Sequence, residues 1–542
     1  MRNVLGSFLA FGILTTLSVV ACSGGSDGGG NGDLGGNGSA DGGATNDGGV
    51  DASSDSAVQS DAGSKIVTGP PKNAATAVSF LDVDPTVGAV GGLVHITKAA
   101  DESDIDSYEI YGADDTGAKV GSSLIGSVPA AGKNVTFTVP EGSAVKLGVT
   151  KLLVLSKNSA GEMTTGPTGI YADATMHKIA LKTFYGSAAV TGAPRIAFDE
   201  ANRKLMIISA TGIYMHCALD GSACTANDIT QGHDFANPAR PAIDDVDGTV
   251  LLSAATMAVR TNGFVIPTTF DGVSSAAVDF TDPTVAGSGY APAAVVDTVR
   301  HRLLNVVRVS DTVYGTNAAD TDVLYDCNFG MTSCTRRDIG VGATPSAQPA
   351  SDGNNSAIAF DSVNQQLYVT GLGPVKANAP PFLLVCPTAT NGTCVGRNDM
   401  ITTSDTYMMR GAVTPIVDSA ASKLDLIVQA TAHSPEIYRC NLDGSSCAAP
   451  LPMQVGTTAS IAGLTRAIGD ELGHEVVAVG LAQSGGAPAL YRCGMDGTRC
   501  SVTPTAAGNQ YFSVDVTIDP ESGQAFIVGA SNDGELYLFY LE

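Results

Sequence analysis

The feature that most constrains the fold is a pattern that recurs seven times between residue 195 and the end of the sequence. In each copy a short apolar stretch ends in an aspartate, and a second apolar stretch begins six positions later. Successive aspartates are roughly 45 to 65 residues apart, the spacing expected of four-stranded β-propeller blades. The sequence therefore predicts a seven-bladed β-propeller over residues 174–542, with one aspartate per blade: Asp199, Asp244, Asp297, Asp361, Asp418, Asp470 and Asp519.

Most of the repeats also contain a pair of cysteines after the third expected strand. Three of these pairs enclose an Asp-Gly step in the order C-x-x-D-G-x-x-C. Asp-Gly favours a tight hairpin turn, which would place the two cysteines opposite each other at a separation that a disulfide tolerates. The second repeat has Thr268 and Ser275 at these positions, so both cysteines are missing together. We predict five local disulfides: Cys217–Cys224, Cys327–Cys334, Cys386–Cys394, Cys440–Cys447 and Cys493–Cys500.

Metal binding is the alternative role for these cysteines. Each pair would then need further ligands to complete a tetrahedral site, and no histidine recurs near the pairs. Disulfides are therefore the preferred interpretation, and they indicate an oxidising compartment.

The two ends of the propeller region complement each other. The last repeat stops before an outer strand, whereas residues 177–184, which precede the first repeat, alternate as a strand does. We expect this segment to complete the last blade, which would remove two exposed sheet edges.

The beginning of the chain has the layout of an export signal. Arg2 precedes an apolar stretch that is too short and too interrupted for a good permanent membrane span. The stretch ends in Val19-Val20-Ala21-Cys22, which resembles the lipobox of bacterial lipoproteins. The resemblance implies that residues 1–21 are removed, that Cys22 is acylated, and that this lipid holds the chain to a membrane. An ordinary secretory signal with a chance cysteine is the alternative.

Residues 22–70 consist almost entirely of Gly, Ser, Asp, Ala and Asn. Such a segment cannot bury enough apolar surface to offset its chain entropy, so we expect a disordered tether. It contains a G-x-S-x-G match at residues 24–28, but that nucleophile motif requires a strand-turn-helix context. Because Ser23 rather than an aspartate follows Cys22, an outer-membrane location in the cell envelope is the preferred prediction, on the periplasmic side or at the cell surface.

Residues 71–173 alternate apolar and polar side chains between Gly, Pro and Asp turns, which predicts an antiparallel β-sandwich. Two segments, Tyr108-Glu109-Ile110-Tyr111 and residues 153–161, resemble the third and sixth strands of a fibronectin type III module. The tryptophan typical of that family is missing, since the chain contains none. The resemblance implies a spacer or adhesive unit.

The composition excludes nucleic acid as a partner, and the motifs indicate neither a catalytic site nor a metal site. A net charge of −25 leaves no basic surface for nucleic acid. The seven aspartates could form a carboxylate ring for a metal, but recurrence in every blade favours a structural role, in which each aspartate caps its own turn. Asp244, Asp245 and Asp247 suggest a calcium loop, yet Thr256 stands where that loop needs a closing glutamate. We therefore predict no catalytic residue, no metal and no cofactor.

The whole layout resembles surface lipoproteins of the myxobacterial type. We predict a monomeric, non-enzymatic protein that is attached through Cys22 and binds a protein or a glycan. Binding sites are often built from variable loops on a rigid scaffold. We therefore expect the ligand to bind at the face that carries the variable loops between second and third strands, at residues 310–322, 371–381, 430–435 and 483–488. The alternative is a propeller hydrolase of the metal-dependent lactonase-like or glycan-cleaving kind. Such an enzyme would need three or more carboxylates or imidazoles in the central channel.

Overall fold

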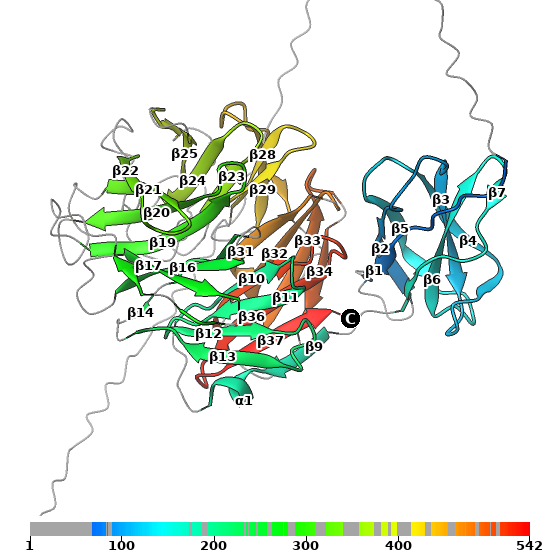
Figure 1. The fold of residues 1–542 in the computed structure, drawn as a ribbon, viewed down its shortest axis with the longest axis horizontal. Coiled ribbons are helices and arrows are strands. Elements are labelled where there is room, and N and C mark those ends of the chain that lie inside the picture. The colour runs from blue at the N-terminus through cyan, green and yellow to red at the C-terminus, as the bar shows by residue number, and fades with distance from the viewer. Residues whose placement is uncertain are drawn as a thin grey trace, which may run out of the picture. The chain divides into compact units, whose positions relative to one another are not determined.

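The computed structural model confirms an all-β chain with a β-sandwich followed by a seven-bladed β-propeller (Figure 1). It describes residues 68–541 with gaps, of which the longest are 257–262, 280–287, 311–320, 340–356, 373–380, 398–412, 429–434 and 454–460. The predicted signal, the acylated Cys22 and nearly all of the tether lie outside the described residues, so these remain predictions. No helix among the residues placed in the structure is long and apolar enough to cross a membrane.

The sandwich consists of two antiparallel sheets. The first contains β1 (Ala77–Phe80), β2 (Ala89–Thr97) and β5 (Val135–Ala144). The second has the order β4 (Lys119–Pro129), β3 (Ser107–Ala113), β6 (Lys151–Asn158) and β7 (Gly161–Glu162), and β8 (Thr168–Ile170) also pairs with β6. The two segments that resemble fibronectin type III strands lie on β3 and around β6, which are paired.

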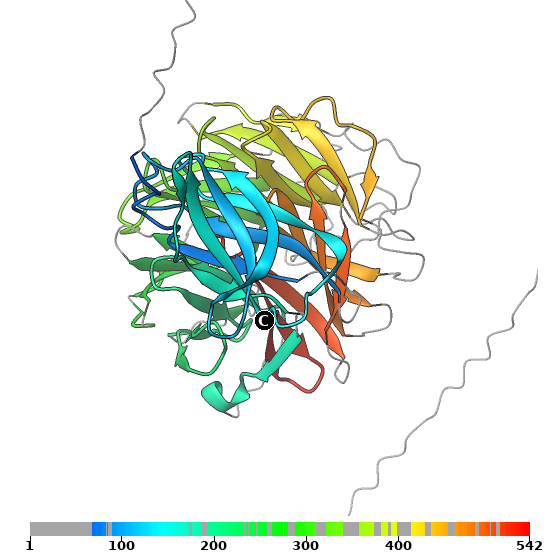
Figure 2. The same cartoon turned by 90° about the vertical axis from the view of Figure 1, so that its right-hand side faces the viewer.

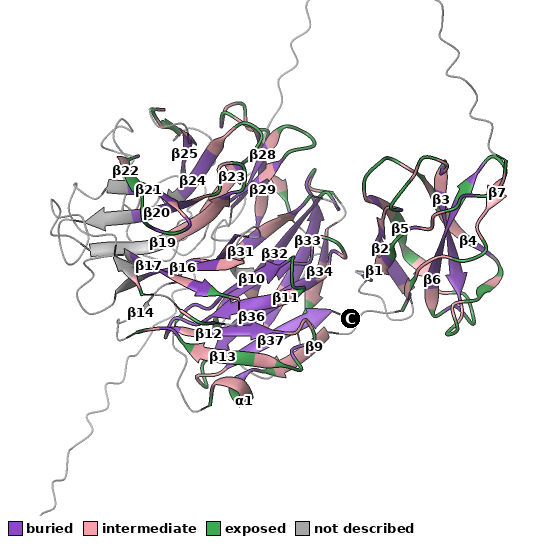
Figure 3. Ribbon diagram, in the orientation of Figure 1, coloured by how far each residue is buried: buried purple, intermediate pink, exposed green. Residues whose placement is uncertain are grey.

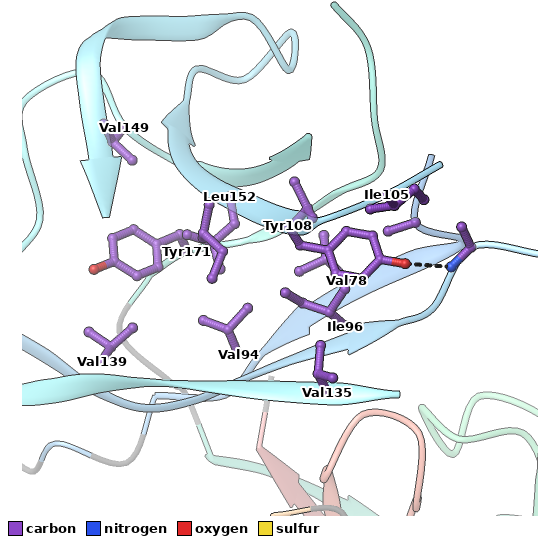
Figure 4. Close-up of a cluster of buried hydrophobic side chains, with 14 of the residues drawn as sticks. Val78, Val94, Ile96, Ile105, Tyr108, Val135, Val139, Val149, Leu152 and Tyr171 are labelled. Atoms are coloured by element: carbon purple, nitrogen blue, oxygen red, sulfur yellow. Dashed lines mark hydrogen bonds between the residues drawn. The ribbon is translucent and has the colours of Figure 1, made fainter. Parts of the chain in front are cut away.

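The core of the sandwich lies between these sheets (Figure 4). Val94 and Ile96 of one sheet pack with Tyr108 and Leu152 of the other, and all four are fully buried. Burying the Tyr108 ring leaves its hydroxyl to be satisfied, and this oxygen accepts a hydrogen bond from the backbone N–H of Ala99 at 2.8 Å. The sheets are thus held together by apolar packing, and the Tyr108 hydroxyl within this core is hydrogen-bonded.

The propeller consists of seven sheets, each of which runs from an inner strand at the channel to an outer strand. Blade 1 contains β10 (Arg195–Asp199), β11 (Lys204–Ile208), β12 (Ile213–Cys217) and β13 (Cys224–Asp228). In blade 2, β15 (Ala242–Asp244) and β14 (Phe235–Ala236) both pair with β16 (Thr249–Thr256), followed by β17 (Gly263–Thr269) and β18 (Val278–Asp279). Blade 3 contains β19 (Ser288–Asp297), β20 (Arg302–Ser310), β21 (Thr321–Asn328) and β22 (Cys334–Asp338). Blade 4 contains β23 (Ala357–Asp361), β24 (Gln366–Leu372), β25 (Pro381–Pro387) and β26 (Val395–Arg397).

Blades 5 to 7 have the same order. Blade 5 contains β27 (Thr414–Asp418), β28 (Lys423–Val428), β29 (Glu436–Asn441) and β30 (Leu451–Pro452). Blade 6 contains β31 (Ile461–Asp470), β32 (Glu475–Ala482), β33 (Pro488–Gly494) and β34 (Ser501–Pro504). Blade 7 contains β35 (Tyr511–Ile518), β36 (Ala525–Ser531), β37 (Leu536–Leu541) and, from the other end of the propeller sequence, β9 (Met176–Ala180).

The pairing of β9 with β37 closes the ring as predicted (Figure 1). Ile179 lies opposite Leu538, and the inner strand β35 of blade 7 contacts the inner strand β10 of blade 1. The predicted strand was too long at its C-terminal end, because residues 182–185 form the short helix α1 (Lys182–Tyr185). The strand pairing ends at Ala180, and Leu181 then turns inward and is fully buried.

Apolar side chains fill the space between neighbouring blades. Figure 2 shows the strands of these blades in a second view, and Figure 3 shows that many strand residues are buried. Between blades 1 and 2, for example, Met206 and Tyr214 pack with Leu252 and Phe264, and all four are fully buried. Corresponding clusters join blades 3 and 4, 4 and 5, and 5 and 6. The blades therefore share their cores with their neighbours, which explains why each inner strand reads as nearly continuously apolar.

Five disulfides confirm the predicted pairs. In blades 1, 3, 4, 5 and 6, each joins the third strand to the beginning of the outer strand or to the residues just before it. They pair Cys217 with Cys224, Cys327 with Cys334, Cys386 with Cys394, Cys440 with Cys447, and Cys493 with Cys500. Blade 2 has no cysteines, and alignment of the repeats predicts that Thr268 and Ser275 take their places. In the structure Thr268 instead lies opposite Ser274. Ser275 is outside the described residues.

Candidate ligand site in the central channel

The inner strands enclose a cavity of about 320 Å³ in the channel of the propeller. This volume is at the lower end of the range for small-ligand pockets. Its walls come from the inner strands or the residues just before them in blades 1 to 6, and most of the lining side chains are small or apolar, as Ala293, Ile358 and Pro415 illustrate. The charged side chains among the described lining residues are Arg195, Arg240, Arg466 and Glu471.

The three arginines occupy the same position in their repeats, four residues before the turn aspartate. Reading this position in all seven blades gives a ring of residues, which we call the channel ring: Arg195, Arg240, Ala293, Ala357, Thr414, Arg466 and Asp515. Four consecutive blades (6, 7, 1 and 2) thus contribute the charged residues, and blades 3 and 4 contribute alanines.

Strand register places the members of the channel ring at one level. In six blades the ring residue pairs with the equivalent residue of the second strand, nine positions after the turn aspartate: Arg195 with Ile208, Ala293 with Val306, Ala357 with Thr370, Thr414 with Ile427, Arg466 with Val479 and Asp515 with Val528. In blade 2 the backbone N–H of Ala239, next to Arg240, donates to the carbonyl of Ser253, which keeps the same alignment. The ring is therefore one layer of residues, four positions before the turn aspartate in each blade.

Asp515 connects the charged side of the channel ring. It is fully buried, its Oδ1 accepts a hydrogen bond from Arg240 Nη2 at 2.8 Å, and its Oδ2 accepts one from the backbone N–H of Ile196 at 3.1 Å. Arg240 Nη2 also donates to the carbonyl of Val516 at 2.9 Å. Arg195 is nearly buried, and its Nη1 donates to the carbonyl of Pro194 at 2.9 Å.

The charged residues of the ring interact with one another. Burial alone would raise the pKa of Asp515, but Arg240, Arg195 and Arg466 outweigh it and lower the pKa, so Asp515 is ionised. Burial lowers the pKa of Arg195 to about 9, with repulsion from Arg466 as the next cause. Burial likewise lowers the pKa of Arg466. The ring therefore combines three guanidinium groups with one carboxylate whose ionised form they stabilise.

Sequence reasoning missed the channel ring. The prediction for the channel weighed carboxylates and imidazoles, whereas the residues that the structure brings together are mainly guanidinium groups. Aligning the seven repeats on their aspartates and reading four positions upstream would have found them, because Arg195, Arg240, Arg466 and Asp515 interrupt an otherwise small or polar column. The chain has 54 acidic but only 29 basic residues. Three arginines at the same position of the repeat are therefore unusual and indicate a candidate site.

The seven turn aspartates lie at the other end of the inner strands and are all buried. Their carboxylates accept hydrogen bonds from backbone N–H groups of the following turn in six blades, as at Asn202 in blade 1 (3.0 Å) and Gly473 in blade 6 (2.9 Å). The fourth residue after each aspartate has a positive φ in all seven blades: Arg203, Gly248, His301, Gln365, Ser422, His474 and Gly523. This geometry is that of a turn-capping residue rather than a metal ligand.

The remaining predicted candidates do not meet in the channel. His216 lies 3.6 Å from Asp199 within blade 1, whereas His301 and His474 each lie 4.0 Å from the turn aspartate of the preceding blade. Within the part of the chain that the structure describes, no group of three His, Cys, Asp or Glu side chains is arranged to hold a metal ion. The loops between second and third strands that were predicted to bind lie almost wholly outside the described residues. The channel ring lies toward that face.

No protein-family model and no curated protein sequence matches the chain. Solved propeller structures are similar to it in fold. YCF48 from Cyanidioschyzon merolae is 11% identical with a TM-score of 0.41, covering 67% of this chain and 98% of its own. A structure of YCF48 bound to D1 peptide is 12% identical with a TM-score of 0.40, covering 67% and 96%. An oligogalacturonate lyase in complex with manganese is 14% identical with a TM-score of 0.41, covering 68% and 91%.

These neighbours include one protein bound to a peptide and one lyase. At such identities and TM-scores they carry no argument about what this chain binds or whether it is an enzyme.

Proposed function

We propose that the chain is a cell-envelope lipoprotein whose β-propeller binds a ligand in its central channel, with the lipid on Cys22. The observation that carries the binding function is the uneven channel ring. Features that repeat in every blade, such as the turn aspartates, serve the architecture. The arginines of blades 6, 1 and 2 break that symmetry in a cavity of ligand size, and Asp515 of blade 7 interacts with them. The ligand that the sequence predicts is a protein or a glycan.

Binding is a better fit to this geometry than hydrolysis. A hydrolase needs an acid–base pair or a metal-activated water at the reacting bond. The carboxylate of the channel ring, Asp515, is instead ionised and engaged by Arg240 and by the N–H of Ile196. Turnover of lactones, esters or glycosides by the full-length protein, lost on Asp515→Asn substitution, would overturn this assignment.

A binding screen with the full-length protein, produced in a bacterial host and extracted in detergent, tests the proposed site. Acidic and neutral glycans and peptides are presented on an array, and each bound ligand is retested with Arg466→Gln. We expect weaker binding by this variant and unchanged binding by Arg336→Gln. Arg336 is the matched control because it pairs with Asp338 at 2.9 Å on an outer strand. Equal binding by all three proteins would exclude the channel as the site.

The anchor is tested separately. If Cys22 carries lipid, the wild-type chain fractionates with membranes and shows the added acyl mass, whereas Cys22→Ala does neither. The sandwich, at residues 71–173, then serves as a spacer between the tether and the propeller. A soluble wild-type chain without acyl mass would contradict the anchor while leaving the channel proposal intact.

A further inference from the structure

We propose that the interface between blades 2 and 3 contains a buried binding site for water, formed by Ser253 and Asn305. Both residues lie on second strands, Ser253 on β16 of blade 2 and Asn305 on β20 of blade 3. The site does not depend on the proposed function, because it needs no ligand in the channel. Strand alternation, the comparison of the repeats and the burial of both side chains support it.

Alternation along the second strands directs both side chains into the same interface. Leu251 precedes Ser253 by two residues, and Leu303 precedes Asn305 by two residues, so each pair shares one face of its strand. Leu251, Leu303 and Val307 belong to one cluster of buried apolar residues from blades 2 and 3. Ser253 therefore faces blade 3, and Asn305 faces blade 2.

Comparison of the repeats shows that both polar residues are exceptions at their positions. Ser253 comes nine residues after its turn aspartate, where the other blades have Ile208, Val306, Thr370, Ile427, Val479 and Val528. Asn305 comes eight residues after its turn aspartate, where the other blades have Ile207, Leu252, Val369, Leu426, Ala478 and Ile527. Thr370 is also polar, but its Oγ1 donates a hydrogen bond to the carbonyl of Val413 at 2.6 Å. Both exceptions fall on the interface of blades 2 and 3.

Neither polar side chain has a hydrogen-bond partner within the described part of the chain. Both residues are fully buried, and the atoms without a partner are Ser253 Oγ, Asn305 Oδ1 and Asn305 Nδ2. A buried polar group without a partner is destabilising, and an apolar residue at either position would remove that cost. Buried groups of this kind are commonly satisfied by an internal water molecule. Two of them at one interface therefore indicate a shared water.

The chemistry of the two side chains matches water rather than an ion. The Ser253 hydroxyl donates and accepts, and the Asn305 amide offers one acceptor oxygen and a donor nitrogen. A water molecule also donates and accepts, so one molecule can bond to the hydroxyl and to the amide together. Both side chains are neutral, and their neighbours Leu251 and Leu303 are apolar, so a bare ion would lose its hydration without compensation.

The site lies one strand behind the wall of the channel cavity. Asn305 pairs with Ala294 of the inner strand β19, and the carbonyl of Ser253 accepts a hydrogen bond from the N–H of Ala239 at 2.8 Å. Ala239 and Ala294 both line the cavity. The strands β16 and β19 are in contact, so the second strand of blade 2 borders the inner strand of blade 3. Water bound here would be held inside the wall rather than in the channel.

A crystal structure of the wild-type protein, at a resolution that shows ordered water, tests the site directly. We expect a water molecule within hydrogen-bond distance of Ser253 Oγ and of one amide atom of Asn305. A direct hydrogen bond between the two side chains, or an interface without ordered water between them, would overturn the proposal. This measurement does not require any variant to fold.

A double-mutant cycle on the full-length protein tests whether the two residues share the water. Ser253→Ala and Asn305→Leu each leave the water and the other side chain with fewer hydrogen bonds, so each should raise the unfolding equilibrium constant in urea. The double variant removes the whole polar site. Its equilibrium constant should be about tenfold lower than the two single effects multiplied together, a coupling of about 1.4 kcal/mol.

Thr370→Val is the matched control for this cycle. It removes a hydroxyl that bonds to Val413, and it lies in another blade interface. Its effect should therefore add to that of Asn305→Leu without coupling. If Ser253→Ala and Asn305→Leu each stabilise the protein and their effects add, the two side chains are dry and unpaired, and the water site is rejected.

Discussion

Buried charged residues that repeat from blade to blade show how the turn aspartates act beyond their own turns. Asp418 accepts hydrogen bonds from its own turn and also pairs with Arg439, which immediately precedes the first cysteine of blade 5. His216, at the equivalent position of blade 1, lies 3.6 Å from Asp199. In blade 7, Asp519 pairs instead with Arg203 of blade 1. The aspartates therefore join strands and neighbouring blades, which a turn cap alone would not do.

Asp425 gives a residue-scale prediction on pH. It is fully buried, its Oδ2 lies 3.3 Å from Arg439 Nη1, and its Oδ1 has no partner among the described residues. Burial raises the pKa of Asp425 to about 7, against the lowering effect of Arg439. Between pH 4 and 7 the folded state therefore binds a proton that the unfolded state has lost. Stability should fall as the pH rises through this window and level off above about pH 7.

Asp425→Asn keeps the shape of the side chain without the ionisation. We expect the variant to lose this part of the pH dependence and to be more stable than wild type at pH 8, by about 1–3 kcal/mol. Arg439 keeps Asp418 and the carbonyl of Met495 as partners. Urea unfolding at pH 5 and pH 8 measures the difference, with Asp443→Asn as a control at an exposed carboxylate of the same blade. If Asp425→Asn lowers the free energy of unfolding by the same amount at pH 5 and at pH 8, Asp425 is ionised in the folded protein at both pH values and the prediction is wrong.

The disulfide hairpins are the clearest unit at the scale of elements. Each links the third strand of a blade to the first residue of the outer strand or to the segment just before it, and each closes a short loop. Blade 2 shows that the hairpin forms without the bridge, because Thr268 pairs with Ser274 there. The bridges are therefore expected to stabilise the outer edges of blades rather than to direct the fold.

Replacing the bridge of blade 5 by the residue types of blade 2 tests this role. The double variant Cys440→Thr with Cys447→Ser should fold, and it should be destabilised by about 2–3 kcal/mol in the chain-entropy account of a short loop. Hydrogen exchange should accelerate in β29 and β30 and remain unchanged in β17 of blade 2. Faster exchange in all blades together would instead indicate that this bridge supports the whole ring.

The architecture could be predicted at this scale because its signals are local. Asp-Gly turns, cysteine spacing and the fixed interval after each turn aspartate all act within one blade, so the strands could be counted from the sequence. The channel ring depends on residues such as Arg195 and Asp515, which are 320 residues apart and meet only when the ring closes. The helical end of the closing segment was also missed, because its alternation continues through residues 182–184 although the pairing stops at Ala180.

At the scale of the whole molecule, the basic residues of the channel contrast with the acidic net charge of the chain. The chain has a net charge of −25, yet its channel concentrates three arginines on one side of a single layer. An acidic protein attracts anions poorly over long distances, so an anionic ligand, if the channel binds one, should associate slowly at low salt and faster as the salt concentration rises. Short-range pairing with the ring would then determine affinity.

Closure of the propeller provides the last prediction, because it makes the stability of the whole ring depend on one short strand. Ile179 of β9 lies opposite Leu538 of β37 and packs against the cluster shared by blades 7 and 1. Ile179→Lys should lower stability by about 2–4 kcal/mol, since it inserts a charge among apolar side chains. Ala180→Lys is the matched control, because Ala180 lies on the same strand and is exposed.

The position of the damage distinguishes closure from general loss of packing. If β9 holds the ring shut, hydrogen exchange in Ile179→Lys should accelerate first in β37 and in the adjoining β10, whose contact with β35 joins blade 1 to blade 7. Blades 3 to 5 should change only when the whole protein unfolds, because their shared cores contain none of these residues. Uniform acceleration in every blade, or thermal unfolding identical to that of Ala180→Lys, would mean that the ring does not depend on β9 for its closure.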